Sequence, residues 1–269
     1  MIYFNKKYQS VLLGTSLLLS LINTGQCATT SQVNIGASSS SLLKKASHDV
    51  KTYGDLIYKG TVFKLDAKAS GHLYVYERRV RSAGDQQFST SFTHDEHNVA
   101  LIQMATHDSG FRLKDYTEYQ YQLGEVGSVT MTGTTAEFSL VNGEIEKKAR
   151  EKVSLPVVVG PTLYGFVYQN WEKLLAGDSV DLRFAVISRL ETVGFILQKV
   201  PSSDNLVRIR MKAGSPLIAL LVDPIYFTFS ADRRLVSLEG RIPTKLKVGN
   251  NWADLDAYIT YENAEINFR

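Results

Sequence analysis

Hydrophobic and polar residues alternate along most of the chain, and this period of two predicts β-strands with one buried and one solvated face. Leu182, Phe184 and Val186 illustrate the pattern, because all three fall on one side of the same run. Short segments rich in Gly, Asp and Asn separate the runs, and Asn142-Gly143 is the strongest hairpin signal among them. Strands of this kind are typical of an antiparallel sheet that packs on one face.

One segment near the middle of the chain follows a different period. Residues 161–176 repeat apolar positions at helical spacing, begin with a proline suited to a first helical turn and are followed by a glycine suited to a helix end. We predict one α-helix here, with a single apolar face. That face contains Leu163, Phe166, Val167 and Trp171.

A one-sided sheet needs a cover for its apolar face, and a single helix among many strands predicts a sheet that wraps around it. The fold class is therefore mainly β, with a curved antiparallel sheet (a half-barrel or open barrel) and one packed helix on the concave side. A ligand could lie between the sheet and the helix. The residues expected to line such a site are Leu163, Phe166, Val167, Trp171, Phe184 and Phe195.

Three stretches carry a resemblance to known proteins: "GPTLYGFVYQNWEKLLAGDSVDLRFAV", "RIRMKAGSPLIALLVDPIYFTFS" and "RRLVSLEG". The region 160–240 resembles a group of uncharacterised bacterial periplasmic β-rich proteins, which implies no particular activity. The predicted arrangement also resembles the half-barrels of periplasmic lipoprotein carriers. That second resemblance implies an apolar cavity for lipid or acyl chains.

The first residues have the order of a secretory signal peptide. Two lysines precede the short apolar run 11–22, and a segment with small residues suited to signal-peptide cleavage ends near residue 28. We therefore expect a signal peptide at 1–28, a disordered or weakly ordered linker at 29–49 and a single β-rich domain at 50–269. This predicts a periplasmic protein or one exported beyond the outer membrane. Lipidation at Cys27 remains an alternative, although the lipoprotein signal needs a small residue where Gln26 stands.

Net charge and cysteine content limit the classes of partner and the chemistry that we expect. The full chain has a net charge of +3, and the leader contributes two of the lysines, so the mature chain is close to neutral and predicts no nucleic-acid partner. Cys27 is the single cysteine of the sequence, so cleavage at or after it leaves no thiol for a disulfide or a nucleophile. We expect no cofactor, and no transmembrane helix after signal cleavage.

Candidate catalytic chemistry is sparse. His94 and His97, with Asp95 and Glu96 between them, are the densest group of metal-ligand types, but they lie between two strands, where a solvated turn is the ordinary finding. No Gly-x-Ser-x-Gly motif is present. Tyrosines crowd two strands around residues 74–76 and 116–121, where they pack or line a ligand cavity.

These observations favour a secreted, non-enzymatic envelope protein that binds a lipid or another apolar small molecule between sheet and helix. One alternative is a structural or protein-interaction component of the periplasm or outer membrane, with an envelope protein as partner. The other is a metal-dependent hydrolase using His94 and His97. A transmembrane β-barrel would share the alternation of the strands, but the helix and the apolar run 216–229 fit a soluble core better.

Overall fold

The computed structural model describes residues 31–34, 37–46, 50–67, 71–203, 205–220 and 222–263. The predicted signal peptide at 1–28, including Cys27, lies outside the described residues. No helix in the described part combines the length and apolar character needed to cross a membrane.

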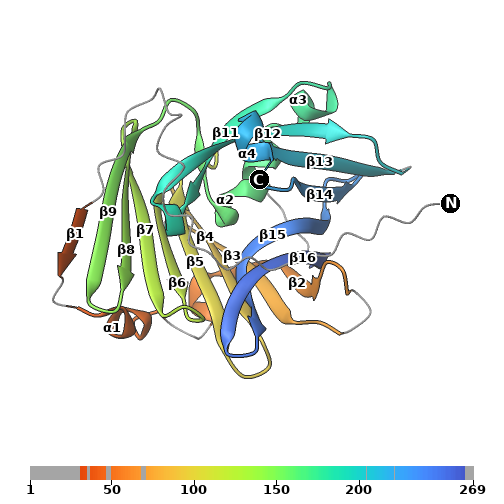
Figure 1. The fold of residues 1–269 in the computed structure, drawn as a ribbon. Coiled ribbons are helices and arrows are strands. Elements are labelled where there is room, and N and C mark those ends of the chain that lie inside the picture. The colour runs from red at the N-terminus through yellow and green to blue at the C-terminus, as the bar shows by residue number, and fades with distance from the viewer. Residues whose placement is uncertain are drawn as a thin grey trace.

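The described strands form one sheet that curves strongly around a central space (Figure 1). The strands are β1 (Ser31–Asn34), β2 (Asp55–Lys64), β3 (Tyr74–Ala83), β4 (Gln86–His94), β5 (Val99–His107), β6 (Leu113–Gln120), β7 (Glu125–Thr132), β8 (Thr135–Asn142), β9 (Ile145–Lys152), β10 (Val157–Val158), β11 (Val180–Val186), β12 (Glu191–Val200), β13 (Leu206–Ala213), β14 (Ile225–Ser230), β15 (Leu235–Val248) and β16 (Asn251–Asn263). Their order is β1-β9-β8-β7-β6-β5-β4-β3-β2-β16-β15-β14-β13-β12-β11-β10. All neighbours are antiparallel except β10 and β11. The predicted mainly β fold with an open, curved sheet is confirmed.

Short helices connect and cover the strands. They are α1 (Ser39–Leu43), η1 (Val50–Tyr53), α2 (Gly160–Gln169), α3 (Trp171–Leu175), η2 (Ile187–Arg189) and α4 (Pro216–Ala219). The segment expected as a linker at 29–49 thus contains β1 and α1 in its described parts. The expected hairpin at Asn142-Gly143 joins β8 to β9, with Gly143 at φ 61°, a conformation that glycine adopts without strain.

The helix predicted at 161–176 is present, but as two consecutive helices. Asn170 lies between α2 and α3 with φ −102° and ψ 15°, and its side-chain amide donates to the Phe166 carbonyl at 2.9 Å. An asparagine side chain that bonds a nearby backbone carbonyl competes with the regular helical ladder. The break at Asn170 follows from that competition.

The first turns of α2 are buried on every side, so the prediction of a single apolar face is wrong for this part of the helix. The buried residues run from Pro161 to Val167. The helix lies inside the curve of the sheet (Figure 1), next to β4 and β5. Thr162 tolerates this burial because its hydroxyl accepts from the Val159 amide at 3.1 Å. The helix therefore fills part of the concavity, as expected of a plug.

We call the strands before α2, β2 to β9, the first arm of the open sheet, and the strands after α3, β11 to β16, the second arm. Side chains connect the two arms at places where no backbone pairing joins them. Glu151 on β9 accepts hydrogen bonds from the amide and the hydroxyl of Thr192 on β12, and it lies 3.7 Å from Arg183 on β11. Ile187 of η2 packs on Gly127 of β7, where an added Cβ would lie 2.0 Å from the isoleucine methyl. These contacts hold the strands after α3 over the first arm and close a space beside α2.

Candidate functional site

A cavity of about 420 Å³ lies beside the N-terminus of α2, between the concave face of the first arm and strands β11 to β15. Leu163, Phe184 and Phe195, three of the residues expected to contact a ligand, line this cavity. Phe166, Val167 and Trp171 are instead buried in the packed core next to it. The structure therefore divides the predicted set between a cavity wall and a filled interior.

A row of residues crosses neighbouring strands in register, and all of its members except Ser91 line the cavity. Tyr58 on β2 is paired with Arg78 on β3, Arg78 with Ser91 on β4, Ser91 with Gln103 on β5, and Gln103 with Glu118 on β6. Directly opposed residues in a sheet point to the same face. The concave face therefore presents a row with polar members, and on β3 and β5 this row is flanked at two positions before and after by Tyr76, Val80, Leu101 and Ala105.

Gln103 is the centre of the hydrogen bonds in this row. Its carbonyl oxygen accepts from the Ser91 hydroxyl at 2.9 Å, and its amide nitrogen donates to the Tyr116 hydroxyl at 2.6 Å and to Glu118 Oε2 at 3.0 Å. The Tyr116 hydroxyl also donates to Glu118 Oε2 at 2.6 Å. Burial raises the pKa of the Glu118 carboxyl above its ordinary value, and these two donors oppose part of the rise.

Arg78 is the other ionisable residue of the row, and its side chain is almost completely enclosed, with 2% of the residue exposed. Nη2 donates to the Gly160 carbonyl at 2.8 Å, which links β3 to the start of α2. Nη1 is buried and has no hydrogen-bond partner in the described structure. No ion pair to Arg78 is present among the described residues.

Tyrosine rings surround this guanidinium. Its central carbon lies 5.9 Å from the ring centre of Tyr58 and 6.0 Å from that of Tyr76. Tyr261 packs edge-on against Tyr58, with ring centres 5.1 Å apart. Burial raises the pKa of the Tyr58 phenol and of the Tyr261 phenol well above the ordinary range. The phenols are therefore neutral at physiological pH and do not balance the charge of Arg78.

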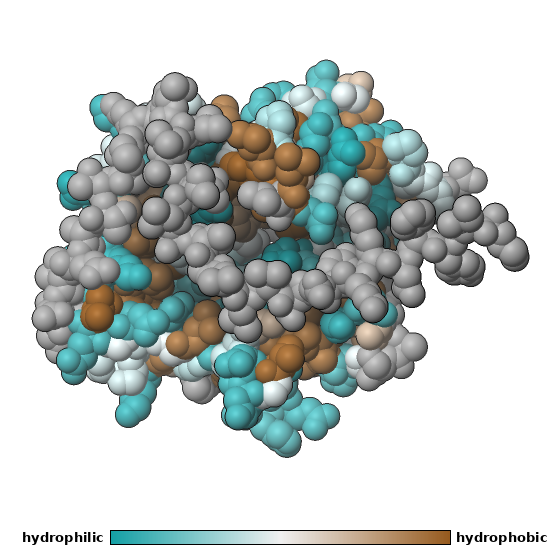
Figure 2. All heavy atoms as spheres, viewed as in Figure 1, coloured by the Kyte–Doolittle hydropathy of each residue, from teal (hydrophilic) through white to brown (hydrophobic). Residues whose placement is uncertain are grey.

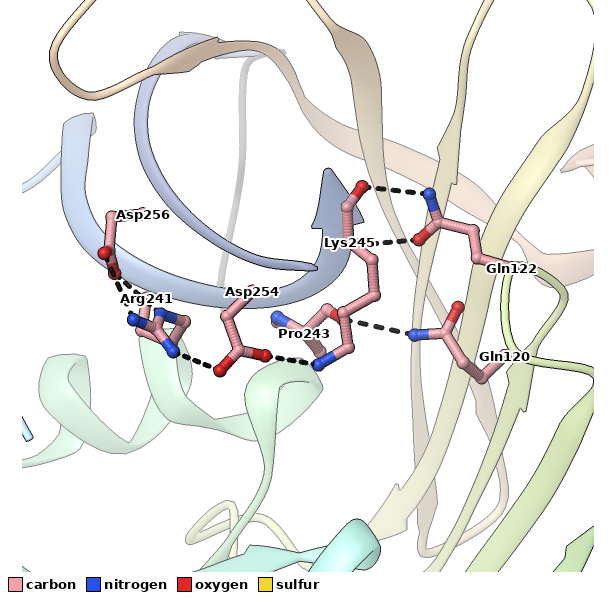
Figure 3. Close-up of polar contacts among 7 residues, drawn as sticks. All are labelled: Gln120, Gln122, Arg241, Pro243, Lys245, Asp254 and Asp256. Atoms are coloured by element: carbon pink, nitrogen blue, oxygen red, sulfur yellow. Dashed lines mark hydrogen bonds and ion pairs between the residues drawn. The ribbon is translucent and has the colours of Figure 1, made fainter. Parts of the chain in front are cut away.

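A polar clasp joins β6 to β15 in the wall of the cavity (Figure 3). We define it as Gln120, Gln122, Pro243 and Lys245. Gln122 accepts from the Lys245 amide at 2.7 Å and donates to the Lys245 carbonyl at 3.0 Å, while Gln120 donates to the Pro243 carbonyl at 3.1 Å. These backbone groups are available because β14 pairs with β15 only as far as Glu239. In this part of β15, the side-chain hydrogen bonds of the clasp take the place of backbone pairing with a neighbouring strand.

Replacement of Gln122 by leucine tests the clasp. It removes the acceptor of the Lys245 amide and one of the two donors to the Lys245 carbonyl, which keeps the hydrogen bond from the Tyr74 hydroxyl at 2.8 Å. We therefore expect a loss of about 1–3 kcal/mol in the free energy of unfolding and faster hydrogen exchange of the Lys245 amide. Gln87→Leu on the exposed β3–β4 hairpin, where Gln87 accepts only from the Ser82 hydroxyl, is the matched control. Equal, small losses for both variants would show that the clasp adds nothing.

Helix α4 lies at the rim of the cavity. Ile218 of this helix and the nearby Val222 line the cavity, whereas Leu220, just after the helix, is 82% exposed. Figure 2 shows apolar side chains gathered over α4 in the upper half of the view. An apolar rim beside an apolar cavity suits the entry of an apolar molecule.

His94 is the last residue of β4, and His97 lies in the turn between β4 and β5. Asp95 organises this turn, because its Oδ1 accepts from the backbone amides of His97 and Asn98 at 2.8 and 2.7 Å. His94 Nδ1 is bound to the carbonyl of Asp95 at 2.8 Å. Among the described residues, no group of three or more histidine, cysteine, aspartate or glutamate side chains is arranged to hold a metal ion.

Arg78, Gln103 and Glu118 were not among the residues predicted for the site. A signal for them exists in the sequence. In "YVYERRV" Arg78 falls on the same side of the strand as two tyrosines and a valine, and in "VALIQMAT" Gln103 falls on the same side as Leu101. Polar residues at inward positions of otherwise apolar strands mark either a buried network or a site.

Comparison with known proteins finds similarity to a solved structure but to no family model or curated protein. A solved structure, the beta-barrel-like protein of the domain of unknown function DUF1849 from Brucella abortus, aligns over 79% of this chain and 96% of its own length, with 12% identity and a TM-score of 0.43.

Proposed function

We propose that this chain is a non-catalytic binding protein that holds one apolar or amphipathic molecule, such as a lipid, in the cavity beside α2. Export to the periplasm, or beyond the outer membrane, is part of the proposal, and it rests on the order of residues 1–28. The cavity is the observation that carries the binding function.

Three properties of the cavity support this proposal. Its volume of about 420 Å³ falls in the range of roughly 300–1,000 Å³ that small-molecule sites occupy. Its walls are largely aliphatic and aromatic. Arg78, Gln103 and Glu118 contribute polar groups from neighbouring strands, and further polar residues of β7, η2, β15 and β16 complete the lining. Concave apolar pockets with a few fixed polar groups are the usual form of a ligand site.

A cavity-filling substitution tests the proposal. Leu238 on β15 lines the cavity and is only partly buried, so a tryptophan there would occupy the open volume. We expect Leu238→Trp to weaken the binding of an apolar fluorescent dye by about tenfold or more, because the dye and the indole compete for one space. The measurement is a dye titration, with thermal unfolding to show that the variant remains folded.

Val248→Trp is the matched control, because Val248 lies on the same strand, is 55% exposed and does not line the cavity. It should bind the dye as the unmodified protein does. If Leu238→Trp and Val248→Trp bind the dye equally, or if the unmodified protein binds none, the proposed function is wrong. The hypothesis of an envelope interaction protein with a filled core would then be the better account.

A further inference from the structure

The charge of Arg78 is not paired with a carboxylate among the residues that the structure describes. Moving a charged group from water into a protein interior is strongly unfavourable unless the charge is paired and its hydrogen-bonding groups are satisfied. Arg78 is fully charged at every physiological pH, since guanidinium does not lose its proton in proteins. Yet its hydrogen-bond partners, the Gly160 carbonyl and the Tyr58 side chain, are not carboxylates, and Nη1 has no partner within hydrogen-bond distance in the described structure.

The carboxylate that shares the row with Arg78 does not pair with it. Glu118 is three strands away from Arg78 in the row, which places their backbones roughly 14 Å apart at the usual strand spacing. Its Oε2 is already bound by Gln103 and Tyr116. The rings of Tyr58 and Tyr76 stabilise the guanidinium by cation–π contact, which does not replace a paired anion. A buried cation that lines a cavity and lacks an anion is a site for an anion.

We propose that the ligand of this cavity carries a carboxylate head group, and that Arg78 binds that head group while the apolar walls hold the tail. This inference rests on the proposed function and names the class of ligand as an amphipathic carboxylate. Guanidinium matches a carboxylate in shape and charge, and the resulting hydrogen bond is charge-assisted. Nη1 is screened from solvent, so entry of the head group requires a side-chain movement, and Tyr76, which is only partly buried, is the neighbour able to move.

Two ligands that differ only in the head group test this inference. Decanoate and decanol have the same tail, and decanoate is ionised at neutral pH. A purely apolar cavity prefers the alcohol, because transfer of a carboxylate out of water is unfavourable. If Arg78 binds the head group, calorimetric titration of the full chain should show decanoate binding about 10- to 100-fold more tightly than decanol.

Substitutions at two arginines of β3 test whether the preference for decanoate depends on Arg78 itself or on any positive charge of this strand. Arg78→Met should remove the preference for decanoate and leave the affinity for decanol unchanged within about threefold. Arg81→Met is the control, because Arg81 lies on the other face of β3, exposed and stacked on Phe88, and this variant should keep the preference. Arg78→Lys, which retains the charge without the planar fork, should keep part of it.

The outcomes distinguish the two proposals. Equal or tighter binding of decanol by the unmodified protein overturns the carboxylate inference but leaves the proposed function intact, and Arg78 then serves only to anchor α2 through Gly160. Binding of neither ligand overturns both. The comparison in the unmodified protein decides the matter even if Arg78→Met fails to fold.

Discussion

Replacement of Trp171 by alanine should lower the free energy of unfolding by about 3–5 kcal/mol, the usual loss for a buried aromatic side chain. Trp171 begins α3, is 3% exposed and packs edge-on against Phe229 with ring centres 5.2 Å apart. The indole lies among other buried side chains of one core cluster, so its removal leaves a cavity. Urea unfolding followed by far-ultraviolet circular dichroism measures the change.

The matched control for Trp171 lies on the same short helix. Leu175 is 37% exposed, and Leu175→Ala should change the free energy of unfolding by less than about 1 kcal/mol. Trp171 does not line the cavity, so Trp171→Ala should also retain dye binding under conditions where it is folded. A loss no larger than that of Leu175→Ala would mean that α3 does not belong to the packed core.

Gly165→Ala should lower the free energy of unfolding by about 1–3 kcal/mol, although alanine favours helices more than glycine does. The reason is a close approach of α2 to the loop before β6. A Cβ at position 165 would lie 2.1 Å from the nearest ring carbon of Phe111. That ring is stacked on His107 at 4.7 Å between ring centres, and Asp108 fixes the loop by accepting from the Gly110 and Arg112 amides.

A double-mutant cycle shows whether the clash is the cause. Phe111→Ala removes the ring, so adding Gly165→Ala in that background should have no unfavourable effect and should stabilise the helix slightly. Urea unfolding of the two single variants and the double variant gives the coupling. Simple additivity of the two losses would contradict the explanation by steric overlap.

The general form of the fold could be predicted from the sequence because alternation and helical spacing are local signals. They indicated an antiparallel sheet, a hairpin at Asn142-Gly143 and a central helix, all of which the structure contains. The break of that helix at Asn170 depends on one side-chain hydrogen bond. The burial of α2 on every side depends on strands β11 to β14 returning over it. Spacing along the helix itself does not report this return.

The site was harder to predict because it depends on register between strands. Apolar periodicity selected Leu163, Phe184 and Phe195, which line the cavity, and equally Phe166, Val167 and Trp171, which lie in the filled core. Periodicity identifies inward residues and does not distinguish a packed interior from a hollow one. Arg78, Gln103 and Glu118 come together only when β3 to β6 are aligned, and that alignment is a property of the folded sheet.

Native mass spectrometry of the protein, purified without detergent and then mixed separately with decanoate and with decanol, is the most direct test of a ligand-binding cavity. We expect one non-covalent adduct per chain with at least one of the two ligands in the unmodified protein and in Val248→Trp, and loss of that adduct in Leu238→Trp. The bare mass alone in all three proteins with both ligands, or an adduct that persists in Leu238→Trp, would show that the cavity does not bind such molecules.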